Sequence, residues 1–144
     1  MGEYRIGMDV RVVSNLIKRK LHQIEPPPQD ADEFTDLQGQ IMHFLFDHRE
    51  RDVFQRELEE EFCMRRSTVS RCLKEMEVRD LIGRTSVAHD ARLKKIALTP
   101  RALEIHQRVE HKIEWIENVI RAGLTAEEVE QFQKIMQKIK QELS

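Results

Sequence analysis

Between residues 65 and 82, the apolar side chains of this chain recur at the spacing of a helix. They stand at positions i, i+3, i+4 and i+7 and therefore share one helical face. The four residues on this stripe are Val69, Cys72, Leu73 and Met76. The spacing predicts a helix that buries one face in a core and leaves the other face outside.

The opposite face of this predicted helix is rich in arginine and hydroxyl groups. It carries Arg66, Ser67, Ser70, Arg71 and Lys74. Arginine forks match O6 and N7 of guanine, whereas hydroxyls and lysine suit phosphate oxygens. This chemistry favours a helix that inserts into the major groove of DNA. A solvated surface helix carries similar residues, so the spacing alone leaves both interpretations open.

Two short runs after this helix, residues 82–86 and 94–98, predict a two-stranded hairpin with a polar tip. In the second run, Ile96 and Leu98 point to one side, as in a half-buried strand. Basic side chains flank the tip. Two helices joined by a turn and followed by a basic hairpin have the layout of a winged helix-turn-helix, although a chance hairpin is the alternative.

The order of these motifs resembles the multiple antibiotic resistance regulator (MarR) family of bacterial transcription factors. The matching segments are QRELEEEF, RRSTVSRCLKEMEVRDLI, Arg84, Asp90-Ala91-Arg92 and IALTPRA. The Asp-x-Arg pair is the most specific element, because it lies six residues after Arg84 and seven before Thr99, in the expected order. In that family the wing arginine reaches the minor groove and the aspartate holds it by an ion pair. The resemblance implies these roles for Arg92 and Asp90.

The resemblance also implies two sets of site residues. The expected DNA contacts are Arg65, Arg66, Ser67, Thr68, Ser70, Arg71, Lys74, Arg84, Asp90 and Arg92. Family members bind small aromatic effectors between the dimer helices and the DNA-binding lobe. The residues expected in such a pocket are Leu16, Lys20, Phe44 and Trp115, for which ordinary core packing is the alternative.

Four positions depart from the family pattern. Phe54 replaces a capping threonine, so either Asp52 caps the next helix or nothing does. Arg65 replaces an N-cap serine, and Cys63 and Asp80 replace glycines. A positive φ strains a residue with a side chain, although aspartate tolerates it better than most. The turn at Cys63 therefore either has a different backbone geometry or stores strain.

Apolar periodicity predicts further helices on both sides of this middle region. Their expected bounds are residues 9–24, 36–48, 54–62 and 100–121, with a last helix opened by Thr125. Pro26 to Pro28 end the first helix, and an acidic linker follows. Thr35 with Gln38 and Thr125 with Glu128 have the spacing of capping boxes, and Thr99 before Pro100 is an N-cap pair.

The last helix carries an apolar stripe with no further partner in the sequence. Its members are Val129, Phe132, Ile135, Met136 and Ile139. A second subunit would cover this stripe, and a helix folded back on its own domain is the alternative. In the family, the first helix and the last two form the dimer. The expected fold is one mainly α domain over residues 1–144, with a winged helix-turn-helix lobe at about 34–99 and dimerisation helices at about 5–25 and 100–144.

The net charge of −2 hides an uneven distribution of charge. Residues 63–99 contain nine Lys or Arg against four Asp or Glu, a local charge of +5, so the rest of the chain carries −7. DNA responds to the field near its phosphates, and a basic face on an acidic body still releases counterions. The overall charge therefore does not exclude DNA binding.

Several classes of protein are not expected from this sequence. No apolar run approaches the roughly 18 residues of a membrane span, and no signal peptide opens the chain, so a cytoplasmic protein is expected. The two cysteines form no CxxC, and the six histidines form no metal-binding pattern. Neither a metal nor a cofactor is expected, and each histidine is assigned to the surface or an interface. A metal site assembled from several elements is the alternative.

No catalytic residues are expected either. The sequence has no nucleophile elbow and no phosphate loop, and Glu59, Glu60 and Glu61 are consecutive, so they point around a helix instead of converging. Oxidant sensing is not expected of either cysteine. Cys63 is the better candidate because two arginines follow it, but its position fits a turn residue packed beneath the helix, and Cys72 is expected to be a small buried hydrophobe.

The primary interpretation is a homodimeric, sequence-specific DNA-binding transcriptional regulator. The resemblance favours a repressor that responds to a small aromatic effector, and twofold symmetry implies a pseudo-palindromic DNA operator. A winged helix that serves protein contacts without sequence-specific DNA binding is the first rival, and Asp90 with Arg92 at the wing argues against it. An enzyme or metal-dependent hydrolase is the second rival.

Overall fold

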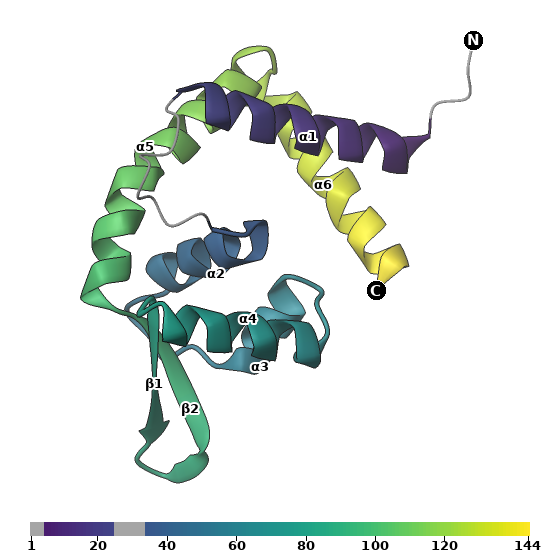
Figure 1. Cartoon of the computed structure of the whole chain (residues 1–144). Coiled ribbons are helices and arrows are strands. Elements are labelled where there is room, and N and C mark those ends of the chain that lie inside the picture. Colours follow the sequence, from purple (N-terminus) through teal and green to yellow (C-terminus); the bar gives the residue numbers. More distant parts are fainter. Residues whose placement is uncertain (1–4, 25–33) are drawn as a thin grey trace. The chain divides into compact units, whose positions relative to one another are not determined.

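A computed structural model describes residues 5–24 and 34–144, and within them six helices and one antiparallel hairpin (Figure 1). The elements are α1 (Ile6–Ile24), α2 (Asp36–Asp47), α3 (Gln55–Glu61), α4 (Arg66–Val78), β1 (Ile82–Val87), β2 (Asp90–Leu98), α5 (Pro100–Ala122) and α6 (Ala126–Leu143). The predicted mainly α fold with a two-stranded wing is confirmed. The prolines at 26–28 and the acidic linker lie outside the described residues.

The chain divides into two compact units. One unit holds residues 34–109, and the other combines the described part of the N-terminal segment with residues 110–144. Helix α5 begins in the first unit and ends in the second. The first unit contains the helix-turn-helix and the hairpin, and the second contains the two terminal helices.

The first unit is built around the apolar stripe of α4. Val69, Leu73 and Met76 are fully buried, and Cys72 is 7% exposed, so the predicted buried face is confirmed. The other buried apolar side chains of this core come from α2, α3, the hairpin, the start of α5 and the segments before α3 and β1. They are Ile41, Met42, Leu45, Val53, Leu58, Leu81, Ile82, Ile96 and Ala102. The opposite face of α4 remains outside this core.

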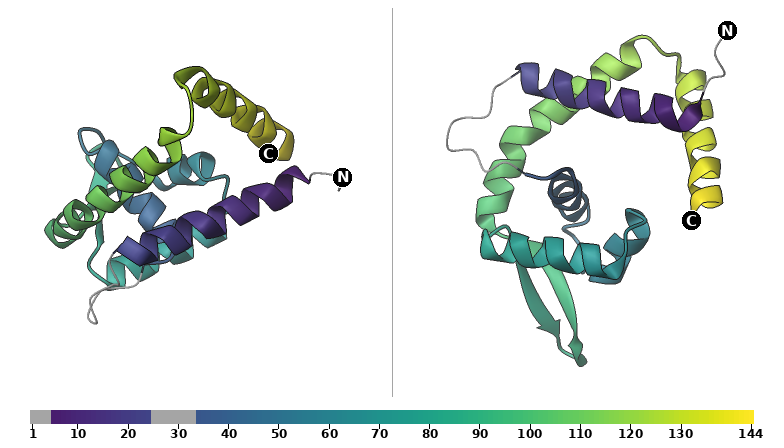
Figure 2. Two further views of the ribbon diagram at one scale, coloured as in Figure 1. Left: turned by 90° about the horizontal axis from the view of Figure 1, so that it is seen from above. Right: turned by 45° about the vertical axis from the view of Figure 1, so that its right-hand side comes forward.

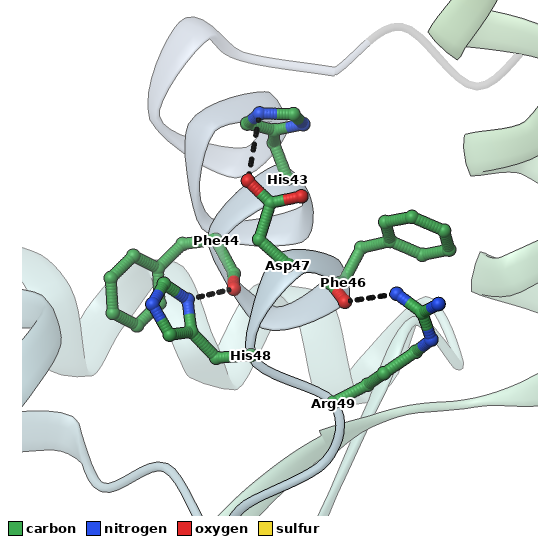
Figure 3. Close-up of polar contacts among 6 residues, drawn as sticks. All are labelled: His43, Phe44, Phe46, Asp47, His48 and Arg49. Carbon is green, nitrogen blue, oxygen red and sulfur yellow. Dashed lines mark hydrogen bonds and ion pairs between the residues drawn. The ribbon is translucent and has the colours of Figure 1, made fainter.

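Side chains form hydrogen bonds with backbone groups at both ends of α2. Thr35 Oγ1 accepts a hydrogen bond from the Gln38 amide (3.2 Å) and Gln38 Oε1 accepts one from the Thr35 amide (3.3 Å), so the predicted capping box is confirmed. At the other end, His48 Nδ1 donates to the Phe44 carbonyl (2.8 Å) and Arg49 Nη1 donates to the Phe46 carbonyl (2.9 Å) (Figure 3). The helix ends at Asp47, one residue before the predicted end.

Two residues in the left-handed backbone region reverse the chain on either side of α4. Cys63, between α3 and α4, has φ of 50°, and Asp80, between α4 and β1, has φ of 56°. Both residues therefore adopt the backbone conformation that glycine adopts most easily. Of the two alternatives given for the turn at Cys63, the structure has the strained backbone. Phe54 stands at the N-cap position of α3, and its side chain forms no capping hydrogen bond.

The hairpin is longer than predicted. β1 and β2 pair in regular register from Ile82 with Leu98 to Ser86 with Lys94, which are the two predicted runs. The register then shifts, so that Val87 pairs with Asp90, residues 91–93 of β2 lie at this irregularity, and Ala88 and His89 form the turn. Ile96 is buried, as the alternation predicts. Its amide donates to the Val53 carbonyl (2.8 Å), a bond that ties the wing to the segment between α2 and α3.

One side of the first turns of α5 enters the core. Thr99 Oγ1 accepts from the Ala102 amide (3.1 Å), which confirms the predicted N-cap, and donates to the Asp80 carbonyl (2.6 Å). His106 lies one turn after Ala102, is 2% exposed, and stacks on the ring of Phe46 with centroids 4.0 Å apart. The expectation that every histidine lies at a surface or an interface is therefore wrong for His106, because helical spacing carries it inward with Ala102.

The second unit leaves much apolar surface exposed. In α6, Phe132 is 59% exposed, and among the described residues no side chain of that helix is buried. Apolar residues of α1, Val13 and Leu16 among them, are exposed as well. In the described part of the chain, no helix is long and apolar enough to cross a membrane.

Candidate nucleic-acid interface

The outward side of α4, which we call the α4 face, gathers the residues that the sequence assigned to base and phosphate contacts. Arg65, Arg66, Ser67, Arg71 and Lys74 are exposed, and Thr68 and Ser70 are half-buried. The buried stripe on the other side fixes the rotation of the helix, because Val69, Leu73 and Met76 are locked in the core. The seven side chains therefore form one polar, basic surface.

The N-terminus of α4 adds backbone donors to this surface. The Arg65 carbonyl accepts from the amides of Thr68 (3.0 Å) and Val69 (3.1 Å), while the Arg65 side chain makes no capping bond. The first amides of a helix have no carbonyl partner within the helix, and the helix dipole is positive at this end. A phosphate oxygen is a suitable acceptor for such amides.

The wing carries the Asp-x-Arg pair on β2. Asp90 Oδ1 accepts a hydrogen bond from the backbone amide of Arg92 (2.8 Å), and Ser86 Oγ donates to the Ala91 carbonyl (3.4 Å). Asp90 thus contacts the backbone amide of Arg92. The family resemblance had instead implied an ion pair between Asp90 and the Arg92 guanidinium. The Arg92 side chain itself is exposed.

Ion pairs and hydrogen bonds occupy three basic side chains of this region. Arg84 pairs with Glu77, Lys95 lies 3.8 Å from a carboxylate oxygen of Asp52, and Arg79 Nη1 donates to Gln38 Oε1 (2.9 Å). The basic residues of segment 63–99 that are exposed are Arg65, Arg66, Arg71, Lys74, Arg92 and Lys94. The exposed positive charge is therefore divided between the α4 face and the outer part of the wing.

The four residues predicted for an effector pocket are distributed over both units. Phe44 belongs to residues 34–109, where its ring stacks on His48 with centroids 4.1 Å apart and meets Phe62 edge-on at 6.0 Å. Leu16, Lys20 and Trp115 belong to the other unit, and all three are exposed. Their convergence on one ligand stays a prediction.

The two cysteines have different surroundings. Burial raises the pKa of the Cys72 thiol, the nearby Glu75 raises that pKa further, and Arg71 lowers it. Cys72 therefore forms a poor thiolate, in keeping with its expected role as a small hydrophobe. Cys63 is exposed. In the described ranges, 5–24 and 34–144, no three His, Cys, Asp or Glu side chains are placed so that they could hold a metal ion.

Sequence patterns missed two features of this interface. One is the bond from Arg79 to Gln38, which joins residues 41 positions apart in the sequence. The other is the pair of Arg84 with Glu77, seven residues away but on a different element. The period-2 pattern of β1 could have shown that Arg84 shares a strand face with the buried Ile82, but it does not show that Glu77 of α4 is its partner.

Comparisons with known proteins match this geometry. Residues 33–93 match the model of the MarR family. A crystal structure of an S. aureus MepR–DNA complex is 25% identical, with a TM-score of 0.81, and the match covers 99% of this chain and 100% of that one. A transcription regulator MarR from Oenococcus oeni PSU-1 is 25% identical, with a TM-score of 0.80, over 95% of this chain and 99% of its own.

A further structure shares the fold at greater distance. S. aureus MepR bound to ethidium bromide is 24% identical, with a TM-score of 0.58, over 98% of each chain. No curated protein matches the sequence. The likeness to solved regulators therefore extends over nearly the full length of the chain, at low sequence identity.

Proposed function

Because this chain belongs to the MarR family of winged-helix regulators, we propose that it is a homodimeric transcriptional repressor that binds a pseudo-palindromic DNA operator. It acts by binding and not by catalysis. The observation that carries the proposal is the α4 face, whose rotation is fixed by the buried stripe behind it. The wing, which presents the exposed Arg92 from the same unit, supports it.

Some residues of the α4 face contact bases, and others contact phosphates. Arg66 and Arg71 can donate two hydrogen bonds each to a guanine edge in the major groove. The hydroxyls and Lys74, with the free amides at the helix N-terminus, bind phosphates and set the register. Arg92 enters the adjacent minor groove, where a cation is attracted by the negative potential. The lobe at about 34–99 thus reads DNA.

The terminal helices at about 5–25 and 100–144 form the dimer. The exposed apolar side chains of α1 and α6, including Val13, Leu16, Phe132 and Ile135, support this assignment. Leaving such faces in water is unfavourable by about 25 cal/mol per Å² of apolar area, so a second copy that covers them gains their burial. A twofold dimer presents its two α4 helices about 34 Å apart, one turn of DNA.

The repressor is released from DNA by a small aromatic effector. A MepR structure of the same fold holds ethidium bromide, a planar aromatic cation, and this supports the class of ligand. The candidate contacts are Leu16, Lys20, Phe44 and Trp115. Effector binding that favours a non-binding arrangement of the dimer lowers operator affinity, since a ligand shifts an equilibrium by its differential affinity for the two states.

Selection from a random duplex library tests the proposal. The full chain is mixed with duplexes at about 0.15 M salt, and the retained sequences are determined. We expect an enriched inverted repeat whose half-sites are centred about one helical turn apart, bound by two chains per site in sedimentation. Retention of duplexes with no common sequence, or a folded monomer at micromolar concentration, would contradict the proposal.

A further inference from the structure

Arg84 lies on the inner side of the wing and not on its exposed surface. Its side chain is 20% exposed, and its guanidinium forms an ion pair with the Glu77 carboxylate. Along β1, Arg84 follows the buried Ile82 by two residues, so both point to the same side of the strand. Its cross-strand partner is the buried Ile96. Arg84 is therefore held at the edge of the core.

This ion pair is placed where the wing leaves the body of its unit. Residues 85–94, the outer part of the hairpin, are all exposed or half-buried. The hairpin extends away from α2, α3 and α4 within that unit (Figures 1 and 2). At its base, β1 is joined to α4 by the pair of Arg84 with Glu77, and β2 is joined to the segment before α3 by the Ile96 amide. A small rotation at this base moves Arg92 over a larger distance.

We propose that Glu77 and Arg84 are positioning residues for DNA recognition. Their ion pair fixes the direction of the wing relative to α4, so that Arg92 and the α4 face reach neighbouring grooves at the same time. This inference rests on the proposed function. It assigns to Arg84 a contact with Glu77 where family resemblance implied a contact with DNA.

The physical reason lies in the burial of the Arg84 guanidinium. A largely buried cation is strongly disfavoured once its carboxylate partner is removed. Without the Glu77 carboxylate, Arg84 regains its hydration by turning outward, and β1 loses its ion pair with α4. The backbone bonds that remain, such as that from the Leu81 amide to the Met76 carbonyl, lie at the start of β1 and leave the outer wing free to change direction. The wing then samples several directions, and the contact of Arg92 forms at an entropic cost.

Glu77→Gln provides a test, because its effect on the net charge and its effect on the wing position should change operator affinity in opposite directions. Removing a negative charge near the interface strengthens attraction to every duplex. Loss of wing position weakens binding to the operator. Glu75→Gln is the matched control, because Glu75 is an exposed glutamate on the same helix, two residues earlier. Both variants change the net charge by +1, and only one of them breaks the ion pair.

The measurement is fluorescence anisotropy with the full chain, using the operator obtained by selection and a scrambled duplex, at fixed salt. We expect Glu77→Gln to weaken operator binding about tenfold relative to Glu75→Gln, within the range for one lost groove contact. On the scrambled duplex the two variants should be alike. In an Arg92→Ala background, Glu77→Gln should cause no further loss, because the group that it positions is absent.

Equal operator affinities for Glu77→Gln and Glu75→Gln would overturn the inference, as would a tenfold loss that persists in the Arg92→Ala background. Glu77→Asp keeps the charge and shortens the side chain, so it should also weaken operator binding, and it replaces Glu77→Gln if that variant unfolds. Wild-type protein that binds no duplex would instead refute the proposed function, and the two failures are thereby distinguished.

Discussion

Gln38 joins α2 to the end of α4, and its replacement by alanine should be among the more destabilising single changes outside the apolar core. Its side chain is 2% exposed. Gln38 Oε1 accepts from the Thr35 amide (3.3 Å), which caps α2, and from Arg79 Nη1 (2.9 Å) at the end of α4. The Arg79 guanidinium also lies over the ring of Phe34 at 4.9 Å. Both acceptor contacts disappear in Gln38→Ala.

The magnitude follows from these contacts. A hydrogen bond from a charged donor contributes about 1.5 to 3 kcal/mol, and one capping bond contributes about 1 kcal/mol. Arg79 is half-buried and can recover some hydration, which places the charged bond near the lower figure. The expected loss in the free energy of unfolding for Gln38→Ala is therefore about 2 to 3 kcal/mol.

Urea unfolding followed by circular dichroism, at one fixed protein concentration, measures this loss. Gln38→Glu is the matched variant, because it keeps an oxygen acceptor beside Arg79 and should cost less than about 1 kcal/mol. Thr35→Ala removes only the other half of the capping box and should cost about 1 kcal/mol. A Gln38→Ala loss no larger than that of Thr35→Ala would show that the bond to Arg79 contributes nothing to stability.

Three further outcomes are expected. Arg92→Ala should weaken operator binding by about 1 to 3 kcal/mol, measured by anisotropy, and an unchanged affinity in a folded variant would remove Arg92 from the interface. Replacing Arg71 by alanine should relax preference at one base pair, whereas Lys74→Ala should weaken binding evenly across sequences and reduce the salt slope by about one; equal losses for both on operator and random duplexes would refute this division. In the folded protein, Cys63 should react with iodoacetamide well before Cys72, because burial raises the pKa of the Cys72 thiol; comparable rates by mass spectrometry would contradict the buried position of Cys72.

The sequence predicted what depends on local spacing. The apolar stripe of α4 and the three N-caps at Thr35, Thr99 and Thr125 were located correctly, because helical period and capping chemistry act within a few residues. The glycines that Cys63 and Asp80 replace drew attention to the backbone at both positions, and of the two alternatives left open for Cys63 the positive φ is the one observed. Each of these features is decided by neighbours in the chain.

Contacts between distant elements could not be predicted in this way. The inward side of α5 carries Ala102 and His106, and neither belongs to the apolar series by which a helix face is recognised. The wing strands also extend past the two predicted runs through a register shift after Ser86 and Lys94, and the alternation of apolar residues does not predict this shift. The ion pair of Arg84 with Glu77 depends on how β1 folds back on α4, which periodicity does not contain.

The central claim is that the α4 face and the wing read a DNA sequence. It is tested most directly by titrating the selected operator and a scrambled duplex of the same length with the wild-type chain at several salt concentrations. We predict that the operator is bound at least about a thousandfold more tightly, and that both affinities fall with salt. Equal affinity for the two duplexes at every salt concentration would contradict the claim.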